Sequence, residues 1–230
     1  MLYDVTAVKA NIRNREGKRV FYQGKGDQLT SSARDYLARE RIEILPAGEA
    51  KPARYRLAGG GYTEEKPEHM THLNAEVLVS KTHPRIAFRG AMDTLESEIL
   101  LCQLVTQGEL KGQLSEILEL ARKVVRWDVL GEAAEPVRLC GMEDAQIRQH
   151  SHFPQAHYGQ PHFMPSAEDG EIILRMNRAR CAARQAELQA VAAFADREGN
   201  PTRTDLLQVL NRLSSMLYIL MIREKAKSRS

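Results

Sequence analysis

The stretch TDLLQVLNRLSSMLYILM, residues 204–221, decides most of what the sequence predicts about the fold. Its leucines recur at intervals of three and four residues, so they form one stripe of an α-helix: Leu206, Leu210, Leu213, Leu217 and Leu220. Such a stripe is typical of a helix that packs against other helices in a core. The stretch therefore predicts a helical bundle that includes residues 203–224.

A polar pair, Asn211 and Arg212, interrupts this apolar helix near its middle. One interpretation is a device that fixes helix register, or a hydrogen bond between helices. The other is a polar face beside the leucines, because Ser214, Ser215 and Tyr218 follow Asn211 at helical spacing. Taken alone, this helix favours the first interpretation.

Composition indicates a folded, soluble protein. The chain has 230 residues, 43% of them hydrophobic and 27% charged, and no uninterrupted apolar run reaches the roughly 18 residues of a membrane span. No signal peptide is recognisable at MLYDVTAVKANIR, so we expect a cytoplasmic protein without membrane contact.

Charge and cysteine content exclude two further classes. The net charge of +3 comes from basic residues interleaved with acidic ones, which is not the pattern of a nucleic-acid-binding surface. Cys102, Cys140 and Cys181 lie far apart, so we expect free structural thiols rather than a disulfide framework or a zinc site.

The sequence pattern changes near residue 60. Before it, short β-branched or aromatic runs and one helix with an N-cap at Thr30 predict a small α+β domain, residues 1–60. After the glycines at 59–61 the pattern becomes helical, and we expect a helical domain over residues 61–230. The expected helices are about 89–108, 110–130, a short piece at 143–150, 169–195 and 203–224.

Two other predicted helices also carry polar residues on one face. Arg180, Arg184 and Glu187 are spaced i, i+4 and i+7 in an alanine-rich helix, and Asp93 and Glu96 lie in the first long helix. If these faces meet the polar face of the last helix, they form a partly buried ionic and hydrogen-bonding site.

Several of these segments resemble one enzyme family. MTHLNAEVLVSKTHPRIAFRGAMDTLESEI (70–99), ARCAARQAE (179–187) and LNRLSS (210–215) resemble, in order and spacing, the ATP:corrinoid adenosyltransferases of the propanediol-utilisation type. The ethanolamine-utilisation branch is more similar still, through KPEHMTHLNAE, LTSSARDYL and RTDLLQVLNRLSS. The resemblance covers nearly the whole chain.

The resemblance implies a mainly α protein: a five-helix bundle preceded by the small α+β domain. It also implies a homotrimer that binds ATP and a corrinoid between subunits, with Mg²⁺ on the phosphates. In the implied reaction, the Co(I) centre of reduced cobalamin attacks the 5′-carbon of ATP, triphosphate leaves, and adenosylcobalamin is the product.

Site residues follow from the resemblance by position. It implies that Asp93 and Arg184 form an ion pair across the subunit interface and that Asn211 faces the nucleotide. Further ligand-binding positions are implied at Thr71, Lys81, Arg85, Arg180 and Glu187.

The chain departs from the family pattern in three segments. Lys66 and Pro67 replace the glycine and aspartate of the family's phosphate loop, so Lys66 is expected to contact phosphate in place of backbone amides. The arginine that closes the helix-four motif is here Leu188. The phenylalanine that covers the lower corrin face is here His162. Phe163 or Phe153 is a candidate for that role, and the alternative is a polar function of His162 itself.

The segment HSHFPQAHYGQPHF, residues 150–163, contains four histidines. Imidazole suits a transition metal, but the spacing matches no established set of ligands. A loop over the corrin is favoured over a metal site, and no resident metal is predicted.

Two functions remain open. One is an adenosyltransferase that serves ethanolamine utilisation; the other is a non-catalytic bundle that binds cobalamin or a nucleotide as a sensor or scaffold. Residues 1–60 could dock the protein to a microcompartment shell or a corrinoid-dependent lyase, or could only cover the bundle.

Overall fold

The computed structural model describes residues 1–50 and 55–227. It divides into two compact units, Met1–Lys81 and Thr82–Ser230, here termed the N-terminal unit and the helical unit. The boundary predicted after residue 60 falls inside the first of them.

The N-terminal unit contains a mixed sheet with the strand order β5-β3-β2-β7-β6-β9-β8. Within it β2 and β3 are antiparallel, whereas β3 pairs with β5 and β2 pairs with β7 in parallel. A separate parallel pair joins β1 to β4. The strands are β1 (Leu2–Tyr3), β2 (Arg13–Arg15), β3 (Lys18–Gln23), β4 (Gln28–Leu29), β5 (Glu43–Pro46), β6 (Tyr55–Leu57), β7 (Tyr62–Thr63), β8 (Met70–His72) and β9 (Val77–Ser80).

Two short helices, α1 (Val5–Asn11) and α2 (Ser31–Arg39), complete this unit. The predicted N-cap is confirmed, because the Thr30 hydroxyl accepts a hydrogen bond from the Ala33 amide at 3.2 Å. Gly61 has φ +83°, and a Cβ there would lie 2.4 Å from the Ile12 carbonyl oxygen. Glycine at this position therefore lets β7 approach the chain beside β2.

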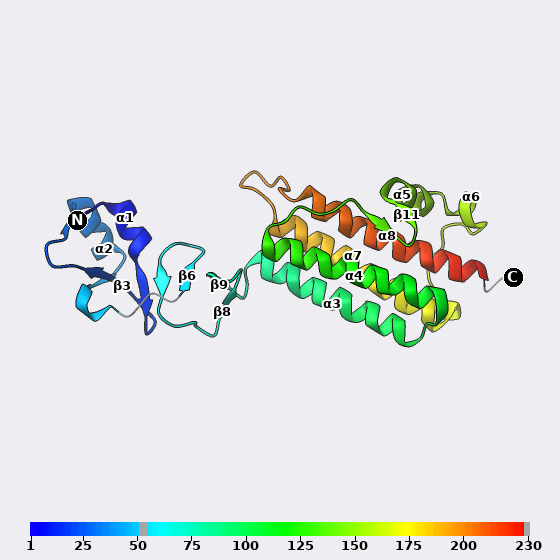
Figure 1. Ribbon diagram of the computed structural model, residues 1–230, viewed down its shortest axis with the longest axis horizontal. Coiled ribbons are helices and arrows are strands. Elements are labelled where there is room, and N and C mark those ends of the chain that lie inside the picture. Colours follow the sequence, from blue (N-terminus) through cyan, green and yellow to red (C-terminus); the bar gives the residue numbers. More distant parts are fainter. Residues whose placement is uncertain (51–54, 228–230) are drawn as a thin grey trace. The chain divides into compact units, whose positions relative to one another are not determined.

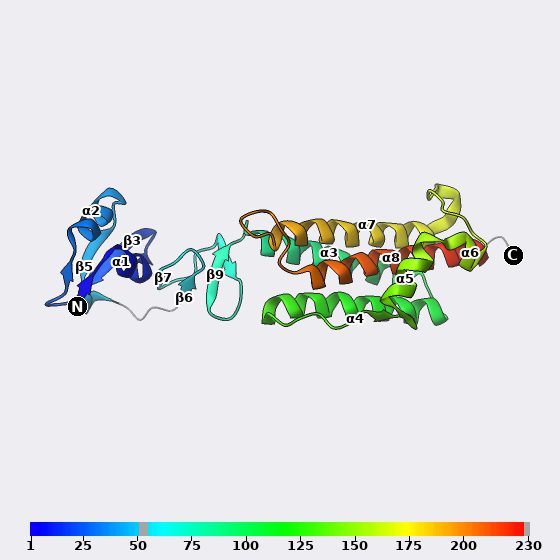
Figure 2. The same ribbon diagram turned by 90° about the horizontal axis from the view of Figure 1, so that it is seen from above.

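Four long helices run side by side in the helical unit (Figure 1; Figure 2). They are α3 (Pro84–Leu104), α4 (Gly108–Leu130), α7 (Gly170–Ala193) and α8 (Thr204–Lys227). A short hairpin of β10 (Arg138–Leu139) and β11 (Met142–Glu143) leads into α5 (Asp144–His152) and α6 (Pro154–Tyr158), and both of these helices pack on α8.

Side-chain size explains how these helices pack. The five predicted stripe leucines of α8 are all buried, as expected: Leu206, Leu210, Leu213, Leu217 and Leu220. On α7 the buried positions are mostly alanines, including Ala179, Ala183 and Ala190. Small side chains allow the close approach of α7 to both α3 and α8, which are its main packing partners.

The predicted fold class is wrong. The expectation was a mainly α five-helix bundle with a small N-terminal α+β domain, whereas the structure is an α/β fold: a seven-stranded mixed sheet accompanies eight helices within residues 1–50 and 55–227. The missed strands β6 to β9 are two to four residues long, and three glycines at 59–61 separate β6 from β7. Such short strands leave too few residues for an alternating pattern to be recognised.

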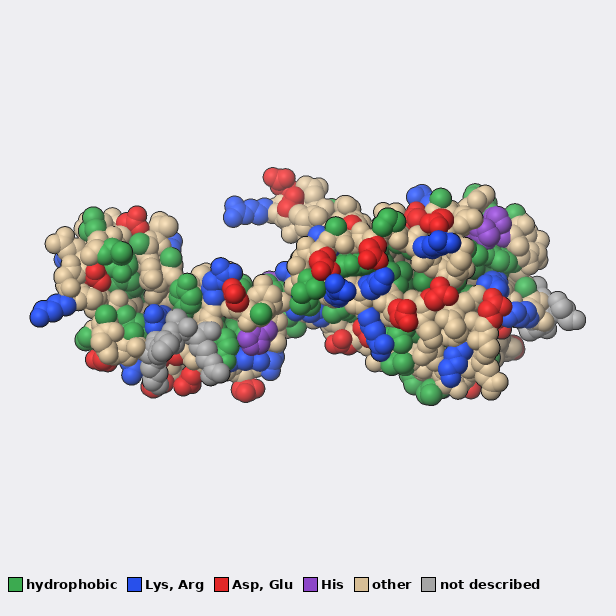
Figure 3. All heavy atoms as spheres, in the orientation of Figure 1, with side chains coloured by type: hydrophobic (Ala, Val, Ile, Leu, Met, Phe, Trp, Pro, Cys, Tyr) green, Lys and Arg blue, Asp and Glu red, His purple; other side chains and the backbone are tan. Residues whose placement is uncertain are grey.

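The helix α8 is long and apolar enough to cross a membrane by length and composition. However, 67% of its most apolar window is buried inside the structure, which is typical of a core helix in a globular protein. On the face of the helical unit seen in Figure 3, basic and acidic side chains are interspersed rather than separated by sign.

Candidate functional site

A cavity of about 780 Å³ lies in the helical unit between α7, α8 and the loop that precedes α7. It brings together five residues that the resemblance implied: His162, Phe163, Arg180, Arg184 and Asn211. The other lining residues are Ser151, His152, Met164, Pro165, Asn177, Cys181, Ser214, Ser215 and Tyr218.

The α7 wall of this cavity is basic. Arg180 and Arg184 lie one helical turn apart, and the lining residues include no carboxylate. The Arg180 guanidinium lies over the Tyr218 ring, 5.0 Å from its centroid, while Arg184 is exposed. Two guanidinium groups in a cavity whose lining holds no carboxylate favour binding of an anion that presents several oxygens.

The α8 wall is polar but uncharged. Asn211, Ser214, Ser215 and Tyr218 line the cavity from the face beside the buried leucines. Both interpretations of the polar pair describe the structure. The side chains beside the leucines share one surface and face the cavity, and Asn211 and Arg212 also bond to Glu187 of α7 and Asp144 of α5. Amide and hydroxyl groups can fix the orientation of a ligand by directional hydrogen bonds.

The loop before α7 covers one end of the cavity through His162 and Phe163. The His162 ring stacks on Tyr218 with 8° between the planes, and its Nδ1 lies 2.9 Å from the Tyr218 hydroxyl. Its Nε2 lies 3.2 Å from the His152 carbonyl oxygen, which can only accept a hydrogen bond. A neutral His162 therefore carries its proton on Nε2 and accepts at Nδ1 from Tyr218.

The same loop gives the cavity an apolar side. Phe163 stacks near Tyr218 at 6.4 Å between ring centroids, and Met164 beside it is 90% exposed. The cavity thus combines cations, hydrogen-bonding groups and aromatic surface. This arrangement suits a ligand with a polyanionic part and a large planar part.

Glu187 lies at the rim, where its carboxylate accepts a hydrogen bond from the Asn211 amide at 3.3 Å. Both residues, together with Arg212 and Gln208, line a smaller adjoining hollow. The structure thus brings together two of the implied positions, Glu187 and Asn211, while their role in binding a ligand stays a prediction.

Asp93 lies on α3 and is exposed. Among residues 1–50 and 55–227, neither Asp93 nor Arg184 takes part in an ion pair. A pair between two subunits, which the resemblance implies for them, stays a prediction.

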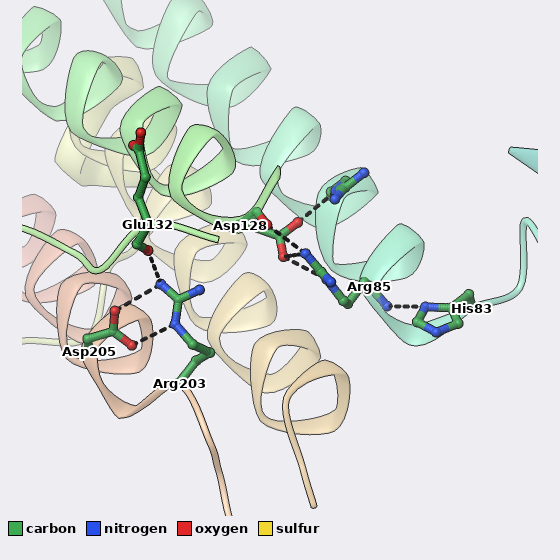
Figure 4. Close-up of polar contacts among 7 residues, drawn as sticks. His83, Arg85, Asp128, Glu132, Arg203 and Asp205 are labelled. Carbon is green, nitrogen blue, oxygen red and sulfur yellow. Dashed lines mark hydrogen bonds and ion pairs between the residues drawn. The ribbon is translucent and has the colours of Figure 1, made fainter. Parts of the chain in front are cut away.

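Arg85 has a buried partner that the sequence did not reveal (Figure 4). Its Nε donates to Oδ1 of Asp128 at 2.8 Å, and Arg89 donates to Oδ2 of the same carboxylate at 2.7 Å. Asp128 is fully buried. Beside them, burial first and the charge of Arg85 second lower the pKa of His83, whose Nδ1 accepts from the Arg85 amide.

The N-terminal unit holds the remaining implied residues. Thr71 lies in β8 opposite Val79 of β9, and Lys81 is exposed with its amide bound to the His69 carbonyl. Lys66 lines a cavity of about 350 Å³ beside Arg15, Glu64 and other residues of this unit. The role of these three residues in phosphate binding stays a prediction.

The histidine-rich segment forms α5, α6 and the covering loop. His150 stacks on His157 at 3.7 Å between ring centroids and shares a 2.7 Å hydrogen bond with Tyr158. Within the part of the chain that the structure describes, no three or more His, Cys, Asp or Glu residues form a metal-binding cluster.

Sequence reasoning missed two kinds of residue. Tyr218 was recognised on the polar face of its helix but not assigned to the site, although it contacts His162, Phe163 and Arg180. Asp128 was missed altogether. The sequence did contain a sign of it, because Asp128 follows the core residue Val124 by four positions and so lies on the buried face of its helix. A carboxylate on a buried face needs a cationic partner.

Comparisons with a family model and with individual proteins point to the same family. Residues 61–224 match the family described as "Cobalamin adenosyltransferase". The chain is 32% identical over 158 residues to "Corrinoid adenosyltransferase EutT" of Escherichia coli (strain K12), and 31% identical over 163 residues to the protein of that name from Salmonella typhimurium. These matches cover 69% and 71% of this chain but only 59% and 61% of the relatives, so the chain spans about three-fifths of their length.

Solved structures show a similar fold. A variant of the PduO-type ATP:corrinoid adenosyltransferase from Lactobacillus reuteri, complexed with cobalamin and ATP, superimposes with a TM-score of 0.53 at 17% identity. The superposition covers 70% of this chain and 91% of that one. Another variant of that protein, complexed with ATP, gives a TM-score of 0.51 at 18% identity, over 70% and 92% of the two chains.

Proposed function

The chain belongs to the cobalamin adenosyltransferase family, and from this we propose that it transfers the 5′-deoxyadenosyl group of ATP to cob(I)alamin. The observation that carries the proposal is the cavity between α7 and α8. There Arg180 and Arg184 face the same space as Asn211 and an aromatic loop, inside the segment that the family covers.

The proposed reaction leaves the protein two tasks. Reduced cobalamin supplies the electron pair on Co(I), the bond from cobalt to the 5′-carbon forms, and the bond from that carbon to oxygen breaks. The electron pair of the broken bond leaves on triphosphate. The protein therefore has to align the 5′-carbon with cobalt and stabilise the negative charge on the leaving group.

The lining residues suit these tasks. We assign Arg180 and Arg184 to triphosphate oxygens, Asn211 with Glu187 to the orientation of the nucleotide, and Phe163 with His162 to the face of the corrin. No carboxylate lines the cavity, so Mg²⁺ would be held through phosphate oxygens, as this ion commonly is in nucleotide sites.

Four further cationic or hydroxyl residues are proposed to act on phosphate: Lys66, Thr71, Lys81 and Arg85. Lys66 and Lys81 are exposed, which leaves their ammonium groups available to an anion. Arg85 uses Nε and Nη2 to bind Asp128, so its contribution would come from its remaining N–H groups.

Assembly forms part of the proposal. We propose a homotrimer in which Asp93 of one subunit pairs with one edge of the Arg184 guanidinium of the next, supported by the exposure of both side chains. The remaining N–H groups of Arg184 then stay available to phosphate oxygens. Light scattering at micromolar concentration checks this. An active monomer would contradict it.

We propose a role in ethanolamine utilisation, which the similarity to EutT proteins supports. We further propose that the protein acts in the cytoplasm, inside or beside a microcompartment, as expected from the resemblance. We propose that residues 61–230 carry the activity and that residues 1–60 form an appended module. That module either docks to a shell protein or a corrinoid-dependent lyase, or covers the catalytic part.

An anaerobic assay tests the activity directly. Protein, chemically reduced cobalamin and MgATP are mixed, formation of the cobalt–carbon bond is followed by absorbance, and triphosphate is measured in the same sample. The proposal expects one triphosphate for each adenosylcobalamin. If both ligands bind and no bond forms, the protein is instead a sensor or scaffold, a reading that the replaced phosphate loop at Lys66 and Pro67 would favour.

A further inference from the structure

The buried arginine of α8 accounts for the polar pair in this apolar helix. Arg212 is 7% exposed, although it follows the exposed Asn211 directly. It does not line the main cavity, whereas Asn211 does. A buried cation next to a ligand-facing amide requires a reason, because an unpaired charge is costly to bury.

The hydrogen bonds of Asn211 fix which end of its amide faces which neighbour. Arg212 Nη1 lies 2.6 Å from one end of the amide, and Glu187 Oε1 lies 3.3 Å from the other. A guanidinium can only donate and a carboxylate can only accept. The end beside Arg212 is therefore Oδ1, and the end beside Glu187 is Nδ2.

Arg212 is itself anchored to another helix. Its Nε lies 2.7 Å from Oδ1 of Asp144 at the start of α5, although that N–H is not aligned on the oxygen, and its Nη2 donates to Oδ2 at 3.3 Å. Gln208, one turn before Arg212 on α8, donates to the same carboxylate at 2.9 Å. The chain of contacts thus runs from α5 through Arg212 to Asn211.

We propose that Arg212, held by Asp144, is a positioning residue that locks the Asn211 amide so that Nδ2 offers an N–H to an acceptor atom of the nucleotide. Nδ2 carries two protons, and Glu187 accepts one of them. The ligand atom beside Asn211 is then a hydrogen-bond acceptor, such as a ribose, phosphate or ring-nitrogen atom. The inference rests on the proposed function, because it takes the ligand to be ATP.

Substitution of Arg212 tests the lock. Arg212→Gln removes the ion pair, and Asp144→Asn weakens the anchor while leaving Arg212 in place, which covers the case that the first variant does not fold. Arg203→Gln is the matched control, because it breaks an ion pair with Asp205 at the start of α8, and neither residue lines the cavity. For each variant we measure the Kd of ATP, the Kd of cobalamin, the melting temperature and the hydrogen exchange of the Asn211 side-chain amide by NMR.

We expect Arg212→Gln to weaken ATP binding about tenfold, the scale of one lost hydrogen bond to a charged group, with cobalamin binding within about twofold of wild type. Asp144→Asn should show a smaller change in the same direction, and both should speed exchange of the Asn211 amide. Arg203→Gln should lower the melting temperature and leave both the Kd of ATP and the exchange of the Asn211 amide unchanged. An unchanged Kd of ATP and unchanged exchange in the two test variants would overturn the inference and leave the transferase proposal intact.

Failure of the proposed function has a different signature. In that case the wild-type protein neither binds ATP nor forms adenosylcobalamin. The proposal that Asn211 donates to an acceptor atom of a nucleotide is then also wrong. The exchange measurement still decides whether Arg212 locks the amide. Faster exchange in Arg212→Gln supports the lock, and unchanged exchange overturns it.

Discussion

Two groups of arginines in the helical unit differ in what surrounds them. Arg85 and Arg89 share the buried carboxylate of Asp128, and Arg203 is bound by Asp205 and by the Glu132 carbonyl (Figure 4). Arg180 and Arg184 line the main cavity, and neither has an ion pair with a carboxylate in residues 1–50 and 55–227.

This difference indicates that the first group stabilises the fold and that the second group is available to bind a ligand. A guanidinium that already binds a buried carboxylate has its charge neutralised, and removing its partner leaves a partly buried cation without its counter-charge. A guanidinium that faces a cavity without a carboxylate keeps its charge for an incoming anion. Sequence alone does not distinguish the two groups, because all five arginines lie in helices or at their ends.

The largest expected effect tests the paired group. Asp128→Ala leaves Arg85 and Arg89 without their shared carboxylate, so the free energy of unfolding should fall by about 3–5 kcal/mol. Urea denaturation measures it. Glu119→Ala, an exposed position on the same helix, should change it by no more than about 0.5 kcal/mol. Equal effects in the two variants would contradict the structural role of Asp128.

The next effect tests the cavity group. Arg184→Gln should slow adenosyl transfer about 100-fold, the scale of losing one charge-stabilising donor, while the free energy of unfolding stays within about 0.5 kcal/mol. Single-turnover transfer and urea denaturation on one preparation give both values. The control is Arg178→Gln on the same helix, which pairs with Glu98 outside the cavity and should keep its rate. A destabilised, fully active Arg184 variant would place Arg184 in the paired group.

A smaller effect concerns the aromatic residue beneath Arg180. Tyr218→Phe keeps the ring but removes the hydroxyl that binds His162, so stability should fall by about 1 kcal/mol and the KM for cobalamin should rise about fivefold. Steady-state kinetics with cobalamin varied checks this. Tyr158→Phe loses a similar bond, to His150, away from the cavity and should affect stability alone. A raised KM in the Tyr158 variant would argue against a specific role for the His162 contact.

The smallest effect is a pH dependence within the paired group. The hydrogen bond from Arg203, the largest cause, lowers the pKa of Asp205 to about 2. Because the folded-state pKa lies below the ordinary aspartate value of 3.8, this stabilisation is complete above about pH 4 and is lost as pH falls towards 2. After allowance for solvent screening it amounts to about 1 kcal/mol.

Urea denaturation at a series of pH values from 5 to 2 measures this loss of unfolding free energy. Asp205→Asn should flatten the curve of unfolding free energy in that window relative to wild type. Curves that stay parallel would show that the pair contributes nothing to acid stability.

Periodic features of the long helices could be predicted from the sequence. The leucine stripe of α8, the N-cap of α2 and the approximate ranges of α3, α4, α5, α7 and α8 agree with the structure, because each rests on contacts between residues three or four apart. The same spacing identified Arg180, Arg184 and Asn211 as residues of polar faces, and these residues do line one cavity.

Features that depend on distant partners could not be predicted. Asp128 lies 43 residues from Arg85 and 39 from Arg89, and no local pattern specifies such a pairing. The strands β6 to β9 pair mainly with one another but are too short to show an alternating pattern, and only β7 pairs with a distant strand, β2, so the sheet and the fold class were missed. The loop residue His162 was located by resemblance, but its bond to Tyr218, 56 residues away, required the structure.

The burial of α8 has a consequence for biogenesis. This helix packs against α4, α5, α6 and α7, all of which precede it in the chain. During synthesis those helices therefore leave the ribosome before the segment that completes their core, and their apolar faces remain exposed until residues 204–227 emerge. That interval makes the unfinished chain a substrate for chaperones, and a slow stretch of translation just before α8 would favour aggregation.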